Sequence, residues 1–169
     1  MQPILYIFSG LPGSGKTTLS QKLAKEKNAV HLRIDTIEQG LRDLCSFNVQ
    51  GEGYRLSYRI ATDNLKLGNS VVADSCNPIV LTRDEWENVA LESGARHVNI
   101  EIVCSDKTEH RSRIGKRYPT VAGLKPPTWN EVLGRHYEPW AKDRIVIDTA
   151  GKSIETCHEE LMEKLGMYA

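Results

Sequence analysis

The stretch Gly10-Leu-Pro-Gly-Ser-Gly-Lys-Thr17 decides the fold of this chain. It matches the pattern G-x-x-x-x-G-K-[ST] of a phosphate-binding loop. The apolar run 4–8 precedes it, and Leu19 and Leu23 follow it at a spacing of four residues, which predicts a strand before the loop and a helix over 16–27. Glycines let consecutive backbone N–H groups curl around a phosphate, and the helix N-terminus adds partial positive charge. The sequence therefore predicts a site for nucleotide phosphates.

The chemistry of phosphate binding gives two side chains of this loop specific roles. Lys16 is placed to reach the β- and γ-phosphates of ATP, and the Thr17 hydroxyl is placed to ligate Mg²⁺. The predicted nucleotide-binding residues are Gly10, Leu11, Pro12, Gly13, Ser14, Gly15, Lys16, Thr17 and Thr18.

The rest of the chain alternates between short apolar runs and segments with helical spacing. Further strands are predicted over 30–34, 71–73, 98–104 and 144–147, and further helices over 54–65, 81–93 and 154–165. Strands that alternate with helices predict an α/β fold with a mainly parallel, five-stranded sheet. We expect one domain over 1–169, because no repeat or linker-like stretch divides the chain.

Composition narrows the functional classes. The chain has 169 residues, with 22 Lys and Arg against 22 Asp and Glu, and this neutrality argues against a protein that coats nucleic acid. No apolar run approaches 18 residues, so no membrane span is predicted. Four cysteines without a Cys-x-x-Cys pair indicate reduced thiols rather than a zinc or disulfide framework. We expect a cytoplasmic protein.

Two aspartates follow predicted strands. Asp35 is expected to end the second strand and Asp74 the third, and ligands of open α/β sheets bind beyond the carboxyl ends of the strands. Asp35 is therefore predicted to accept a hydrogen bond from an acceptor hydroxyl and orient it toward the γ-phosphate. The alternative is that Asp35 only begins a helix, and the two roles can coexist. Asp74 is predicted to hold Mg²⁺, directly or through water, with a turn carboxylate as the alternative.

A lid is predicted over 106–128. Arg113 and Arg117 lie four residues apart on a predicted helix, and the stretch 118–128 is rich in proline and glycine. Guanidinium groups at that place would stabilise charge on a transferring phosphoryl group, whereas the alternative is an ordinary solvated helix face.

The chain resembles the small P-loop kinases grouped with the polynucleotide 5′-hydroxyl kinase domain, the zeta toxins, chloramphenicol phosphotransferase and gluconate kinase. The segments that carry the resemblance are the loop at 10–18, Arg-Ile-Asp at 33–35, 68–74, Arg-x-x-x-Arg at 113–117 and 144–149. The resemblance implies a three-layer P-loop NTPase fold with an NMP-kinase-like sheet and a small helical lid.

The resemblance also implies a reaction in which ATP and Mg²⁺ phosphorylate a hydroxyl group. It gives Asp35 the role of the acceptor-activating carboxylate, makes Lys16, Arg113 and Arg117 catalytic, and places the adenine near the segment after Asp148.

The acceptor pocket is the least determined region of the sequence. The expected wall runs over 36–64, with Arg42, Tyr54 and Arg55 as the substrate-binding candidates. The alternatives are that Tyr54 packs in the core and that Arg42 only pairs with Glu38, four residues earlier.

Three hypotheses remain beside the favoured small-molecule kinase. The first is a polynucleotide 5′-hydroxyl kinase, which needs only few contacts to an oligonucleotide end. The second is an ATPase switch that regulates a partner and has no phosphoryl acceptor. The third is a nucleoside-monophosphate kinase. Membrane partners are not expected, and the oligomeric state is not determined by the sequence.

Overall fold

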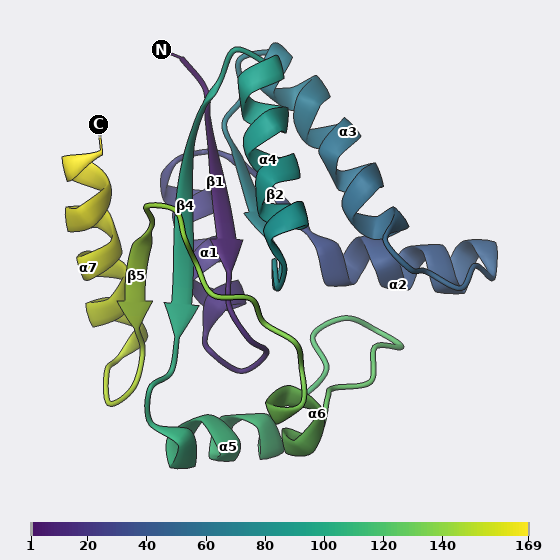
Figure 1. Ribbon diagram of the computed structural model, residues 1–169, viewed down its shortest axis with the longest axis vertical. Coiled ribbons are helices and arrows are strands. Elements are labelled where there is room, and N and C mark those ends of the chain that lie inside the picture. The colour runs from purple at the N-terminus through teal and green to yellow at the C-terminus, as the bar shows by residue number, and fades with distance from the viewer. Residues whose placement is uncertain (1, 169) are drawn as a thin grey trace.

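The computed structural model describes residues 2–168, and its centre is a parallel five-stranded sheet (Figure 1). The strands are β1 (Ile4–Ser9), β2 (Val30–Arg33), β3 (Val71–Asp74), β4 (Arg96–Val103) and β5 (Ile145–Asp148), in the order β2-β3-β1-β4-β5. Every neighbouring pair is parallel. The predicted α/β fold with a five-stranded sheet is confirmed.

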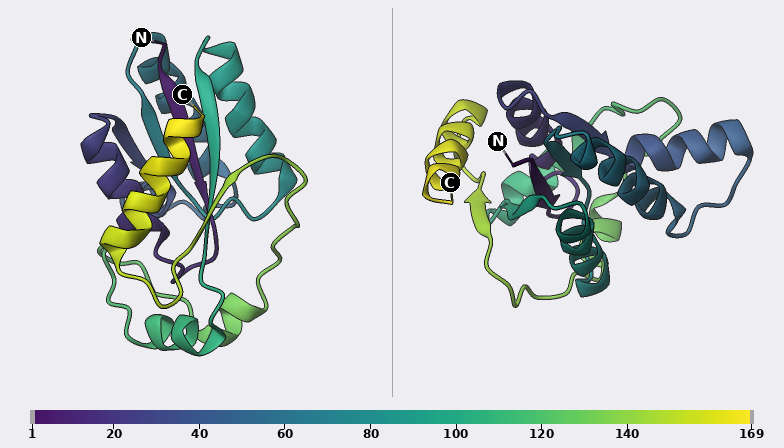
Figure 2. Two further views of the ribbon diagram at one scale, coloured as in Figure 1. Left: turned by 90° about the vertical axis from the view of Figure 1, so that its left-hand side faces the viewer. Right: turned by 90° about the horizontal axis from the view of Figure 1, so that it is seen from above.

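Helices cover both faces of the sheet, which makes three layers (Figure 2). One face packs against α1 (Lys16–Glu26) and α7 (Ile154–Met167), and the other packs against α3 (Glu52–Lys66) and α4 (Val80–Glu92). The alternation along β1 explains this division, because Tyr6 and Phe8 enter the first core and Leu5 and Ile7 enter the second. Such two-sided burial requires the continuous apolar runs from which the strands were predicted.

The remaining helices lie toward the carboxyl ends of the strands. Helix α2 (Ile34–Cys45) projects sideways from the sheet, whereas α5 (Lys107–Gly115) and α6 (Trp129–Leu133) lie beyond the ends of β1 and β4 (Figure 1). The segment 116–128 between α5 and α6 has no regular secondary structure, as its prolines and glycines predicted. None of the described helices is long and apolar enough to cross a membrane.

Two boundary predictions were wrong in ways that affect the site. Strand β2 ends at Arg33 and α2 begins at Ile34 without a loop, so Asp35 lies in the first turn of a helix rather than at the end of a strand. Helix α5 ends at Gly115, so Arg117 lies beyond it and does not share a helix face with Arg113. At the first of these places the buried Ile34 packs into the core as the first residue of α2, which a local pattern does not encode.

Candidate functional site

The phosphate-binding loop joins β1 to α1 and has the backbone conformation that its glycines permit. Gly10, Gly13 and Gly15 all have positive φ, and Gly15 is the N-cap of α1. A Cβ at Gly10 would collide with the Ile102 carbonyl, and one at Gly13 would lie 2.6 Å from Ile114 Cδ1. The loop therefore requires glycine for its left-handed backbone and for its close neighbours.

Two side chains support the loop from outside it. The hydroxyl of Thr149, directly after β5, lies 2.8 Å from the Ser14 carbonyl, and His110 Nε2 on α5 lies 2.7 Å from the Pro12 carbonyl. Neither residue carries a signal that sequence reasoning could have used, because each approaches the loop from more than 90 residues away. Their contacts fix two of the loop carbonyls in place.

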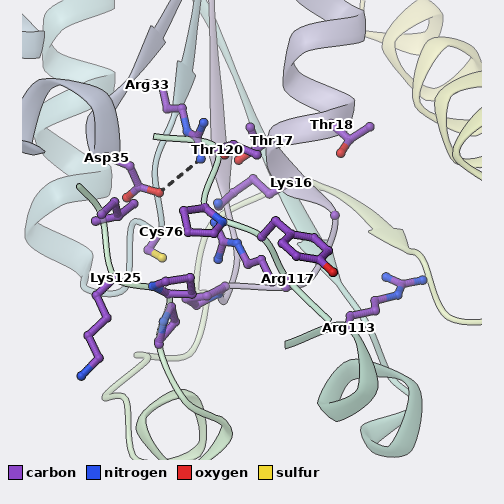
Figure 3. A pocket seen from close by; sticks show the side chains of 18 of the residues that line it. Lys16, Thr17, Thr18, Arg33, Asp35, Cys76, Arg113, Arg117, Thr120 and Lys125 are labelled. Atoms are coloured by element: carbon purple, nitrogen blue, oxygen red, sulfur yellow. Dashed lines mark ion pairs between the residues drawn. The ribbon is translucent and has the colours of Figure 1, made fainter. Parts of the chain in front are cut away.

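A cavity of about 720 Å³ opens against the loop (Figure 3). It is lined by loop residues, by the first half of α2 and by the segment 116–128. Of the predicted site residues it brings together Pro12, Gly13, Gly15, Lys16, Thr17, Thr18, Asp35, Arg42, Arg113 and Arg117. The lining residues not among those candidates include Gln21, Arg33, Glu38, Cys76, Thr120, Lys125, Glu131 and Arg135.

Lys16 is a deeply buried cation of the cavity. Its Nζ lies 3.4 Å from the Asp74 carboxylate, and both side chains are at least nine-tenths buried. Burial lowers the pKa of Lys16, but the Asp74 charge outweighs that effect and the net shift is upward. Lys16 is therefore protonated at neutral pH and presents a fixed positive charge.

Asp74 lies behind Lys16 rather than on the cavity surface. Arg33 Nε lies 3.9 Å from its carboxylate and His31 Nε2 lies 4.0 Å away. Neither Asp74 oxygen has a hydrogen-bond partner within the described residues, so the buried carboxylate retains capacity for a further ligand. No cluster of three His, Cys, Asp or Glu side chains suited to a metal occurs in the described part of the chain.

Asp35 faces the cavity from the first turn of α2. Its carboxylate lies 3.7 Å from the Arg33 guanidinium and remains 47% exposed (Figure 3). Glu38 lines the cavity one turn later and lies 3.3 Å from Arg42. Burial raises the pKa of Glu38, and Arg42 opposes that shift. Two carboxylates and two guanidinium groups thus meet at the α2 side of the cavity.

The two lid candidates have different environments. Arg113 donates to Thr149 and pairs with Glu109 at 2.6 Å, which ties α5 to the segment after β5. Arg117 lies in the middle of the cavity view, between Arg113 and Lys125 (Figure 3). The neighbouring residues Tyr118, Pro119 and Thr120 line the cavity opposite the phosphate-binding loop.

Other candidates lie outside the cavity lining. The Tyr54 hydroxyl accepts from the Asn77 backbone N–H, and Tyr54 packs on Tyr58, which in turn packs edge-on against Trp86 at 4.6 Å. Arg55 is exposed on α3. Of the two interpretations of Tyr54, packing in the core is therefore the one that fits, because its position on α3 places it against other aromatic side chains rather than in the cavity lining. The segment after Asp148, expected near the adenine, also contributes no lining residue.

Comparison with known proteins shows which family and which solved structures the chain is similar to. A family model described as an AAA domain matches residues 5–138, and no curated protein matches the chain. A gluconokinase from Sinorhizobium meliloti 1021 is 15% identical, with a TM-score of 0.70, over 99% of this chain and 94% of that chain. The Mycobacterium tuberculosis APS kinase CysC in complex with AMPPNP and APS is 18% identical, with a TM-score of 0.68, over 98% of both chains.

A third structure, Chaetomium thermophilum Kti12 in complex with ADP-AlF3, is 18% identical, with a TM-score of 0.69, over 95% of this chain and 96% of that chain. At such identities the similarity establishes the fold alone, which is the three-layer P-loop fold that small kinases share. Because the family match spans most of the sequence, the protein belongs to the AAA domain family.

Proposed function

We propose that the protein is an ATP- and Mg²⁺-dependent kinase that transfers the γ-phosphoryl group to a hydroxyl of a small-molecule acceptor. One observation carries this proposal. The half-exposed carboxylate of Asp35 faces the same cavity as Lys16 and Thr17 of the phosphate-binding loop. A protein that only binds or hydrolyses ATP has no need of a carboxylate that could receive an acceptor hydroxyl beside the phosphate site.

The acceptor reaction needs a group that orients the attacking hydroxyl. Asp35 accepts the hydrogen bond of that hydroxyl, and its oxygen attacks the γ-phosphorus. The new P–O bond forms as the bond to the β–γ bridging oxygen breaks, ADP leaves with that electron pair, and the hydroxyl proton passes to Asp35. The Arg33 guanidinium, 3.7 Å away, helps to hold the carboxylate in position.

The nucleotide is held by charge and by backbone donors. The loop N–H groups at the N-terminus of α1 receive the phosphates, Lys16 contacts the β- and γ-phosphates, and Thr18 follows in the first turn. Arg117 stabilises charge on the transferring group, and Arg113 does the same if it exchanges its Glu109 pair for phosphate. The segment 106–128 acts as the lid in this proposal.

The donor set near the loop fits Mg²⁺. Thr17 offers a hydroxyl on the cavity surface, and Asp74 offers a buried carboxylate whose oxygens lack hydrogen-bond partners. Mg²⁺ prefers oxygen ligands and keeps several waters, so a threonine, phosphates and a water-bridged aspartate suffice. When bound, the ion neutralises charge on the β- and γ-phosphate oxygens.

The test is Mg²⁺-dependent transfer of γ-labelled phosphate from ATP to pools of sugars, nucleosides, nucleoside monophosphates, amino-sugar nucleotides, hydroxylated antibiotics and 5′-hydroxyl oligonucleotides. We expect a labelled small-molecule product. Asp35→Asn should lower its formation at least about 100-fold while the affinity for ATP stays within about twofold, because the variant loses only the proton acceptor. Asp63→Asn, an exposed change on α3, is the matched control and should retain full activity.

Other results would identify other activities. Labelling of oligonucleotides alone would identify a polynucleotide kinase, and labelling of nucleoside monophosphates alone would identify a kinase of that class. ATP hydrolysis that no acceptor stimulates, and that Asp35→Asn leaves unchanged, would contradict the proposal and indicate a nucleotide-dependent switch.

A further inference from the structure

The cavity is strongly cationic in a chain of zero net charge. Its lining includes seven lysine or arginine side chains and three carboxylates, whereas the whole sequence has 22 of each kind. Charge concentrated in this way raises the local concentration of anions. The question is whether the phosphates of the nucleotide alone account for this excess of cationic side chains.

Five of these cations already have a partner or a proposed task. Lys16 pairs with Asp74, Arg33 lies between Asp74 and Asp35, and Arg113 pairs with Glu109. Arg42 pairs with Glu38, and Arg117 is the lid cation of the proposed reaction. The other two, Lys125 and Arg135, come from the segment 116–128 and the turn after α6.

Arg135 and Lys125 make no ion pair among residues 2–168, although both line the cavity. The nearest side-chain partner of Arg135 is Cys76 Sγ, 3.7 Å from Nη1, and a thiol is a weak acceptor. A cavity-lining arginine that has no ion-pair partner is suited to a planar or tetrahedral anion.

Arg42 and Arg135 line the same cavity as Asp35. Arg42 lies 3.3 Å from Glu38, and Glu38 and Asp35 are three residues apart on the same side of α2. Burial raises the pKa of Glu38, whereas the charges of Arg42 and Arg135 both lower it, so both guanidinium groups lie within electrostatic range of this carboxylate. Arg33, nine-tenths buried beside Asp35, has two guanidinium nitrogens without a hydrogen-bond partner.

Resting on the proposed kinase function, we propose that the acceptor is a small anionic alcohol: Asp35 receives its hydroxyl, and Arg42 and Arg135 hold its phosphate or carboxylate group. The carboxylates of Asp35 and Glu38 are acceptors for hydroxyl hydrogens, and the guanidinium groups are donors for the anion. An acceptor with both kinds of group offers a partner to each of these side chains, whereas a neutral alcohol leaves Arg135 without an anion and Arg42 with Glu38 alone.

The test uses acceptors that differ only in charge. Ribose 5-phosphate is compared with ribose, glycerol 3-phosphate with glycerol, and gluconate with glucose, each with labelled ATP. We expect kcat/KM for at least one charged member to exceed that of its neutral parent about tenfold or more. Arg135→Gln and Arg42→Gln should each lower that kcat/KM about 10- to 100-fold, mainly through KM for the acceptor, and change KM for ATP less than about twofold.

Lys66→Gln, an exposed change at the end of α3 away from the cavity, is the control and should leave every parameter as in the wild type. Equal use of charged and neutral members, or a better 5′-hydroxyl oligonucleotide than any small anion, would overturn the inference and leave a kinase in place. Preference for phosphate over carboxylate, or the reverse, identifies the anionic group.

A binding measurement separates the inference from the proposed function. With AMPPNP and Mg²⁺ occupying the phosphate-binding loop, calorimetry should detect inorganic phosphate binding at a second site, weakened about tenfold or more by Arg135→Gln. Absence of that binding, or binding that Arg135→Gln does not change, would overturn the inference even if a neutral acceptor were phosphorylated. Failure of the kinase assay with phosphate binding intact would instead contradict only the proposed function.

Discussion

His31 is an ionisable side chain that lies beside the phosphate site without lining the cavity. Its Nε2 lies 3.0 Å from Ser20 Oγ and 4.0 Å from Asp74. Burial lowers the pKa of His31, the Asp74 carboxylate opposes this and the Arg33 guanidinium adds to it, and the net shift is downward from 6.5. The folded protein therefore binds a proton at this position less readily than the unfolded chain does.

This difference predicts a pH dependence of stability. Above about pH 6.5 both states hold a neutral His31 and the stability is fully present. As the pH falls below 6.5 the unfolded state takes up the proton first, so the free energy of unfolding decreases, by at most about 1.4 kcal/mol per pH unit. His31→Gln should remove this part of the decrease in urea unfolding between pH 5 and 8.

The exposed His97 gives the control, because His97→Gln should leave the pH profile as in the wild type. A His31→Gln profile parallel to that of the wild type would show that the histidine titrates alike in both states.

At the scale of elements, the segment 116–128 connects two sides of the cavity. It leaves α5, passes opposite the phosphate-binding loop at Tyr118–Thr120, and reaches α2 at Gly123. Val121 is buried, and a Cβ at Gly123 would lie 3.0 Å from Gln39 Nε2. Because few apolar contacts hold this segment, its opening costs less free energy than global unfolding.

Gly123→Ala is expected to release the segment from α2. Gly123 has φ +79°, so alanine there costs about 1–2 kcal/mol in backbone strain, and its Cβ presses on the Gln39–Asp43 hydrogen bond. We expect hydrogen exchange of amides 118–125 to accelerate about 5- to 30-fold while global stability changes little. Gly115→Ala, where a Cβ meets nothing within 4 Å, is the matched control. Equal exchange rates in both variants would show that the Gly123 contact does not hold the segment.

At the scale of the molecule, the net charge of the chain differs from the charge of the cavity lining. The chain is neutral overall, yet cations outnumber carboxylates in the cavity by more than two to one. Fields of this kind act over about a Debye length, which shrinks from roughly 30 Å at 0.01 M salt to about 3 Å at 1 M. Encounter with an anionic ligand should therefore respond to salt in a way that the net charge does not suggest.

We expect the association rate constant of a fluorescent ATP analogue to fall at least about tenfold between 0.01 M and 1 M salt. The free energy of unfolding should change by less than about 1 kcal/mol over the same range, because exposed ion pairs such as Lys22–Glu155 and Lys142–Asp84 contribute little to stability at any salt concentration. Stopped-flow fluorescence measures the first quantity and urea unfolding the second. An association rate independent of salt would show that the cavity charges are compensated before binding.

Much of the fold could be predicted because its signals are local. Leu5 to Phe8 form a continuous apolar run, and such a run between turn signals favours a buried strand whatever the distant context. The predicted end of a strand was wrong where tertiary packing overrode the local sequence pattern. The prediction extended β2 through Ile34, but this buried residue begins α2 and packs into the core beside α3. The site was predicted less completely, since only part of its lining belongs to motifs.

The sequence by itself determined the phosphate-binding loop and its place between a strand and a helix. Successive glycines, a lysine and a threonine specify that backbone within eight residues, and no distant contact is needed to recognise it. Only the tertiary structure decided which polar side chains join the loop. It brought Arg135 and Lys125 to the cavity and turned Tyr54 into the core. Helix phase and loop path are set by the summed burial of residues far apart in the chain, and no local pattern contains that sum.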